Sequence, residues 1–138
     1  MVAAGPVFSS GSYAMMDINV TDCVQLFSDV IVNSTCRLIE PDQPVPDWVN
    51  ALPEGPTKRE KIAFVKRYGS PNVFSQFQAH VTIGWAANET LLASAVEALR
   101  GSPLTRAPPF VGEVVALGAV GEHGTVLRGE NFAEFQVA

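Results

Sequence analysis

The stretch of sequence that decides the fold is Phe77-Gln78-Ala79-His80-Val81-Thr82-Ile83-Gly84-Trp85. Its side chains alternate with a period of two, which is typical of a β-strand. Because residues two apart on a strand project from the same face, His80 and Thr82 are expected to point together. We predict that these two share a concave face that solvent reaches. The other face is expected to carry Trp85 and two buried residues, Val81 and Ile83.

The segments before this strand predict another strand, a helix and a loop. Tyr13 to Val20 alternates loosely, and Thr21 is a capping residue that begins a helix expected over Asp22 to Cys36. The apolar stripe of this helix should pack on the strand before it. Glu40 to Pro56 contains five prolines and is expected to be an ordered connecting loop that docks through Trp48.

Further elements lie on both sides of the deciding strand. A helix expected over Lys58 to Tyr68 should begin at a capping box, Thr57-Lys58-Arg59-Glu60, and end at Gly69. Asn88 should cap a later helix that ends at Gly101. Three closing strands are then expected, over Phe110 to Leu117, Thr125 to Arg128 and Phe132 to Val137.

Length and composition favour one domain that covers residues 1–138. The chain is 47% hydrophobic, which suffices for a core, and its order of helices and strands places it in the α+β class. The formal charge of −5 and the pI near 4.9 argue against a broad nucleic-acid footprint, which needs a basic face. A small nucleotide or an RNA end is compatible with this charge.

The cysteines and the apolar runs indicate a cytoplasmic protein without a membrane span. Cys23 and Cys36 lie thirteen residues apart on one expected helix, a separation of roughly 20 Å that forbids a disulfide. We interpret both as reduced thiols in the core. The first residues lack the features of a signal peptide, and no apolar run reaches the roughly 18 residues that a membrane span needs.

His80 and Thr82 are the best candidates for chemistry. An imidazole can move a proton near neutral pH, and an adjacent hydroxyl can donate a hydrogen bond to a phosphate oxygen. The alternative is a structural histidine on a half-buried sheet. His123, in Gly121-Glu122-His123-Gly124-Thr125, also precedes a threonine, but its glycine neighbours favour an ordinary histidine in a hairpin turn that lies near a ligand at most.

Other residues are weaker candidates for binding. Five basic side chains fall within ten positions and form either a guide for phosphate or an ordinary solvated helix face: Lys58, Arg59, Lys61, Lys66 and Arg67. Asn72 lies in a turn before the deciding strand and is a candidate phosphate contact. Aromatic residues that could stack a base are Tyr68, Phe74, Phe77 and Trp85, although Trp85 fits a core position better. No motif for a metal or cofactor occurs, so neither is expected.

The run Tyr68-Gly69-Ser70-Pro71-Asn72-Val73-Phe74, followed by Phe77 to Ile83, a capped helix and a closing hairpin, resembles the second half of 2H phosphoesterases. These include cyclic phosphodiesterases and 2′-5′ RNA ligase-like proteins. The resemblance covers about Tyr13 to Val137. Members commonly have proline before the motif histidine, where this chain has Ala79.

The resemblance implies lobes of antiparallel sheet flanked by helices, each lobe contributing one His-x-Thr or His-x-Ser to a shared cleft. It makes His80 one acid-base residue and Thr82 one phosphate donor, and it suggests Asn72, Phe77 and His123 as substrate contacts. The first lobe is expected to be incomplete, with its motif upstream of Met1. The implied ligand is a nucleotide or RNA terminus, with the second half-site supplied upstream or by a homodimer. The alternative is a non-catalytic nucleotide- or RNA-binding module.

Overall fold

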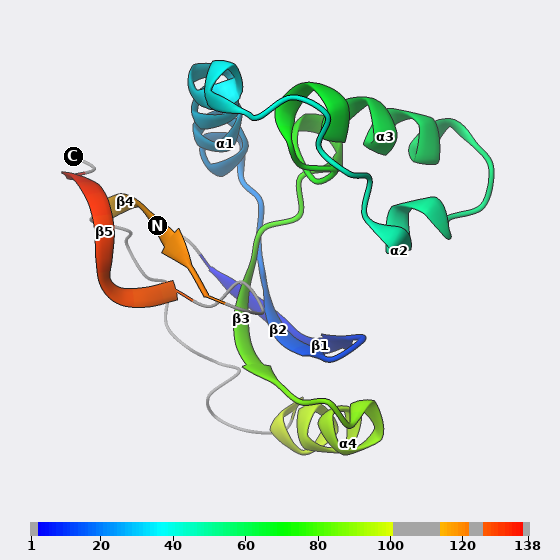
Figure 1. The fold of residues 1–138 in the computed structure, drawn as a ribbon. Coiled ribbons are helices and arrows are strands. Elements are labelled where there is room, and N and C mark those ends of the chain that lie inside the picture. The colour runs from blue at the N-terminus through cyan, green and yellow to red at the C-terminus, as the bar shows by residue number, and fades with distance from the viewer. Residues whose placement is uncertain (1–2, 101–113, 122–125, 137–138) are drawn as a thin grey trace. The chain divides into compact units, whose positions relative to one another are not determined.

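The computed structural model describes residues 3–100, 114–121 and 126–136, and it has the mixed α+β class expected from the sequence (Figure 1). The chain divides into two compact units. One, the sheet unit, comprises the residues up to Asn19 and those from His80 onward. The other, the helical unit, comprises Val20–Ala79. Each unit is built from its own contacts.

The sheet unit contains a three-stranded antiparallel sheet in the order β1-β2-β3. β2 (Tyr13–Ile18) and β3 (His80–Trp85) confirm the two strands expected at these places, with shorter bounds. β1 (Ala4–Ser10) was not expected, because its glycine, proline and paired serines hide any alternation. Gly11, with φ 54°, closes the hairpin between β1 and β2 in a conformation that favours glycine.

Helix α4 (Glu89–Arg100) packs on β1 and β2, and the core of the sheet unit lies between the helix and these strands. As expected, Asn88 caps it: its Oδ1 accepts a hydrogen bond of 3.0 Å from the backbone N–H of Leu91. Four buried side chains, two from the helix and two from the strands, form the apolar cluster: Leu92, Val96, Val7 and Ala14. This cluster defines one face of the sheet as its buried face.

A second antiparallel pair, β4 (Val114–Val120) and β5 (Val126–Gln136), also belongs to the sheet unit. The two strands expected near the C-terminus are one continuous strand here. Gly129 lies at φ 83° within β5, and the pairing with β4 shifts register around Gly118, so the strand accommodates the irregularity without ending. The predicted helix end at Gly101 and strand start at Phe110 lie outside the described residues.

The helical unit contains α1 (Asp22–Thr35), the short helix α2 (Asp47–Asn50), α3 (Pro56–Tyr68) and the 3-10 turns η1 (Cys36–Leu38) and η2 (Phe74–Gln76). Thr21 caps α1 and Gly69 ends α3 at φ 70°, both as expected. The predicted capping box at Thr57 was wrong. Gly55 is the N-cap of α3 and Pro56 occupies its first turn, which moves the start upstream of Thr57.

Two adjacent charged residues of α3 hold the segment that precedes β3. The carboxylate of Glu60 accepts hydrogen bonds from Ser75 Oγ at 2.9 Å and Gln76 Nε2 at 2.7 Å, which explains why it forms no capping box. The buried Lys61 Nζ donates to Asn72 Oδ1 at 2.7 Å and lies 5.4 Å from the centre of the Trp48 ring. Burial lowers the pKa of the Lys61 amino group.

The two cysteines are free as predicted, but one of them is not in the core. Both cysteines are free thiols, but Cys23 is exposed, so its assignment to the core was wrong. α1 has no buried residue, and its contacts with η1 and η2 lie within the helical unit. The packing of its apolar stripe on the preceding strand therefore stays a prediction. In the described parts of the chain, no helix combines the length and apolarity needed to cross a bilayer.

The core of the sheet unit predicts a difference between two neighbouring leucines of α4. Leu92 is 7% exposed and Leu91 is 65% exposed. Leu92→Ala should lower the free energy of unfolding by roughly 2–4 kcal/mol because it opens a cavity, whereas Leu91→Ala should change it by less than about 0.5 kcal/mol. Urea unfolding followed by tryptophan fluorescence measures both. Equal losses would contradict the placement of this helix.

Candidate functional site

The position of His80 and Thr82 is set by the register between β2 and β3. His80 is paired with Asp17, and Thr82 is paired with Met15. Directly opposed residues of antiparallel strands project from the same face. Asp17 and Met15 alternate along β2 with Ala14 and Met16, which belong to or pack against the buried cluster. His80 and Thr82 therefore lie on the face of the sheet that α4 does not cover.

A β-bulge in β3 produces this placement. Gly84 pairs with Ala14 and Thr82 pairs with Met15, so Ile83 is an extra residue with no partner of its own on β2. In an unbroken register, Met15 would oppose Ile83 and Met16 would oppose Thr82. His80 and Thr82 would then have turned toward α4. The bulge moves both of them to the open face.

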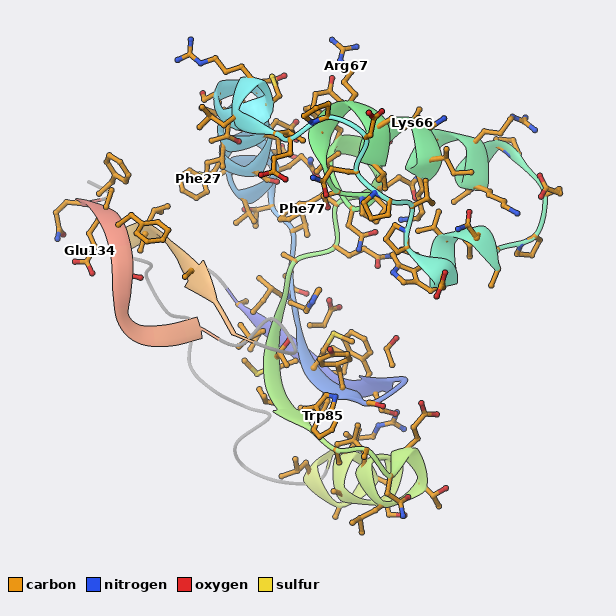
Figure 2. All side chains as sticks on the ribbon, viewed as in Figure 1. Phe27, Lys66, Arg67, Phe77, Trp85 and Glu134 are labelled. Carbon is orange, nitrogen blue, oxygen red and sulfur yellow. The ribbon has the colours of Figure 1, made fainter. Side chains whose placement is uncertain are left out.

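The same bulge changes the expected position of Trp85. This residue is paired with Tyr13, which shares its face of β2 with Met15 and Asp17. Trp85 therefore lies on the face of Thr82, and its expected place beside Val81 was wrong. The indole is 43% exposed at the end of β3 that leads into α4 (Figure 2). A core position, which its strand spacing had favoured, is excluded.

The open face thus carries three rows of side chains across the sheet. The row of His80 and Asp17 ends near Gly5, whose Cβ, if present, would lie 3.1 Å from the Cβ of Asp17. The middle row contains Thr82, Met15 and Phe8, and the last contains Trp85, Tyr13 and Ser10. The imidazole and the carboxylate thus lie at one end of the face, the Thr82 hydroxyl lies in the middle row next to them, and the rings of Trp85 and Tyr13 lie at the other end.

The predicted exposure of the β3 side chains is right for His80 and Thr82 and wrong for Val81 and Ile83. His80 and Thr82 are exposed, which confirms that solvent reaches them. Val81 and Ile83 are 41% and 45% exposed, so their predicted burial was wrong. The physical reason is that α4 packs on β1 and β2. Within the sheet unit, β3 receives no comparable cover from the described residues.

Two weaker candidates lie in the helical unit, so their use together with His80 stays a prediction. The side-chain oxygen of Asn72 accepts the hydrogen bond from buried Lys61, which gives this residue a structural task. Phe77 follows η2 and is half-buried. The third candidate, His123, lies outside the described residues.

Other residues considered for binding have clear structural roles. Tyr68 and Phe74 stack edge to face with each other, 4.8 Å between ring centres, and both contact Phe64. The basic helix divides between a buried Lys61 and exposed residues such as Lys66 and Arg67, which project from the end of α3 (Figure 2). The solvated-face interpretation therefore fits the exposed members, and Lys61 is a core residue.

Sequence reasoning missed Asp17 and Tyr13 as members of the candidate site. The sequence contained a signal for Asp17, because this acid interrupts the apolar residues of a strand. Among residues 3–100, 114–121 and 126–136, no three His, Cys, Asp or Glu side chains form a group that could hold a metal ion. Comparison with protein-family models, with curated proteins and with solved structures found no match in any of the three.

The bulged register predicts specific methyl contacts. The Met15 methyl group should show a nuclear Overhauser effect to the Thr82 methyl group, and the Met16 methyl group should show one to Val81, because opposed Cβ atoms lie about 4.5–5.5 Å apart. Selective methyl labelling of methionine, threonine and valine measures these contacts. A contact between Met16 and Thr82 in its place would show an unbroken register and contradict the assigned faces.

Proposed function

We propose that this chain is a 2H-type phosphoesterase half-site that acts on a 2′,3′-cyclic phosphate or a 2′-5′ phosphodiester of a nucleotide or an RNA end. The observation that carries the proposal is the common, exposed face of His80 and Thr82 on an antiparallel sheet. Their spacing supplies a proton-transfer group beside a hydroxyl donor. This is one half of the pairing that 2H phosphoesterases use.

In the proposed mechanism, His80 moves a proton to or from water or a ribose oxygen. The Thr82 hydroxyl donates a hydrogen bond to a non-bridging phosphate oxygen and stabilises it as negative charge develops. Both groups act directly on the ester, so the reaction is proposed to need no metal. General acid-base catalysis of this kind contributes about 10²–10⁴-fold per positioned group.

The aromatic row supports a ligand that contains a nucleobase. Trp85 and Tyr13 are opposed on the same face as Thr82, two residues further along β2. A strand rises about 3.3 Å per residue, which places this row roughly 7 Å from the row of Thr82. Stacking on an aromatic side chain contributes about 1–3 kcal/mol per base and tolerates any base. We therefore propose that the phosphate binds at Thr82 and the base at Trp85.

The charge of the chain supports a small ligand. At a formal charge of −5 it repels a long polyanion. A single nucleotide or an RNA terminus engages few phosphates and is compatible with this charge. A cytoplasmic location is part of the proposal, because such ligands occur there and both described cysteines are free.

A second proton-transfer group is needed for efficient turnover, because His80 supplies either the acid or the base. We propose a homodimer as one source of this group. In a symmetric pair, each protomer would present the same face to its partner and bring two His-x-Thr motifs together. This arrangement makes activity dependent on protein concentration.

Binding tests the phosphate role of Thr82. Titration of the full chain with 3′-AMP in low salt should give weak binding that falls as salt is added. Thr82→Val should weaken it by about 10- to 150-fold, because a hydrogen bond to a charged group contributes roughly 1.5–3 kcal/mol. Thr90→Val, a matched change at an exposed position of α4, should leave it unchanged. Absence of binding, or equal effects of the two variants, would contradict the proposal.

Turnover tests the role of His80. Hydrolysis of 2′,3′-cyclic AMP should be about 10²–10⁴-fold slower than with a complete acid-base pair, and His80→Ala should abolish it. The rate per chain should rise with protein concentration if a dimer completes the site. An ordinary enzymatic rate that survives His80→Ala would overturn the assignment. Binding with no His80-dependent hydrolysis at any concentration would identify a non-catalytic nucleotide-binding module.

A further inference from the structure

We propose that Asp17 is a specificity-determining residue: its negative charge on the open face of the sheet selects a phosphate ester with one negative charge over a phosphomonoester with two. The ester class that it favours is a phosphodiester, open or cyclic. This inference deepens the proposed function and rests on it, because it takes Thr82 as the residue that holds the phosphate.

The strands of the three-stranded sheet carry very little charge. Among the aspartate, glutamate, lysine and arginine residues of the chain, Asp17 is the only one that lies in β1, β2 or β3. It lies on the face that α4 does not cover. An aspartate side chain is negatively charged near neutral pH. These strands therefore give the open face one negative charge and no lysine or arginine.

The nearest segments of the chain supply no cation to this face. Within residues 3–19 and 80–100, Arg100 is the only lysine or arginine. Its Nη1 lies 2.9 Å from Glu97 Oε2, and its Nε donates a hydrogen bond of 3.5 Å to the carbonyl oxygen of Val7. Val7 belongs to the buried cluster between α4 and the strands. Arg100 is thus bound on the α4 side of the sheet, and these segments leave the charge of Asp17 uncompensated.

Asp17 lies close enough to Thr82 to act on a phosphate that binds there. Met15, two residues from Asp17 on β2, is paired with Thr82. Asp17 and Thr82 are therefore diagonal neighbours on one face, and such residues lie about 7–8 Å apart. On the β1 side, the neighbour of Asp17 is Gly5, which has no side chain to cover the carboxylate. Asp17 is half-buried, so salt screens its charge less than at a fully exposed position.

Repulsion at this distance separates two classes of phosphate ester. Coulomb repulsion is proportional to the charge of the ligand, so a doubly charged phosphomonoester is repelled twice as strongly as a singly charged diester. For a separation of about 7–8 Å, in surroundings between water and a protein surface, each additional charge lowers the affinity about threefold to tenfold. A like charge beside a binding site is a general means of rejecting a wrong partner.

The same discrimination acts between the substrate and the product of the proposed reaction. Hydrolysis of a 2′,3′-cyclic phosphate adds water and breaks one P–O bond, and the resulting monoester releases a second proton to solvent above about pH 6. The product then carries one negative charge more than the substrate. Repulsion by Asp17 therefore favours release of the product and limits its inhibition of the next cycle.

The test compares two ligands that differ by one charge, 3′-AMP and its methyl ester, at pH 8 and a fixed low salt concentration. NMR titration of the full chain gives both dissociation constants, and their ratio is the selectivity for the ester. Asp17→Asn keeps the size of the side chain and removes its charge. It should strengthen the binding of both ligands and lower the selectivity about threefold to tenfold.

Two further variants separate the charge of Asp17 from its other properties. Asp17→Glu keeps the charge and changes the length of the side chain, so it should retain most of the selectivity. Glu97→Gln removes one negative charge from α4, which packs on the other face of the sheet, and should change the selectivity by less than about twofold. Equal effects of Asp17→Asn and Glu97→Gln would show that only the net charge of the chain matters, which overturns the proposal.

The outcomes distinguish this proposal from the function on which it rests. If the wild type binds both ligands and Asp17→Asn leaves the selectivity unchanged, Asp17 has no part in specificity and the proposed function stands. If neither ligand binds to the wild type or to Asp17→Asn, the proposed function is wrong, and the role of Asp17 is wrong with it.

Discussion

The register between β2 and β3 is the constraint on which the candidate site depends. One extra residue, Ile83, decides that His80 and Thr82 face away from α4 and that Trp85 joins them. Side chains alternate across a strand, so a change of one position exchanges the two faces of everything beyond it. The bulge thus converts a stretch with even alternation into one whose His, Thr and Trp residues share a face. A deletion at this point would rearrange the site without removing any of its polar residues.

The two units are held together by different kinds of interaction. In the sheet unit, α4 is held on β1 and β2 by an apolar cluster that includes Leu92 and Val96, with a cap at Asn88. In the helical unit, α3 holds the segment around η2 through hydrogen bonds of Glu60 and Lys61. Hydrophobic burial is strong but has no direction, whereas hydrogen bonds to charged groups fix the path of a backbone. Hydrophobic burial thus holds α4 on its strands, and directional hydrogen bonds hold the segment around η2.

The open face of the sheet gathers groups of complementary chemistry. A carboxylate, an imidazole and a hydroxyl lie in neighbouring rows, and aromatic rings lie further along the same strands. Proton transfer, phosphate stabilisation and base stacking all suit a nucleotide ester, and each is weak when it acts alone. Under the proposed function, a ligand that spans the rows would engage all of them together.

The sequence by itself determined the α+β class, most helix and strand positions, the caps at Thr21, Asn88 and Gly69, and the common face of His80 and Thr82. These follow from local spacing and from backbone preferences within a few residues. The tertiary structure decided the exposure of Val81 and Ile83, the face of Trp85, the burial of Lys61, and the pairing of Asp17 with His80. The physical reason is that burial and register depend on which strand or helix lies opposite. Asp17 and His80 are 63 positions apart in sequence, so no local pattern contains their strand pairing.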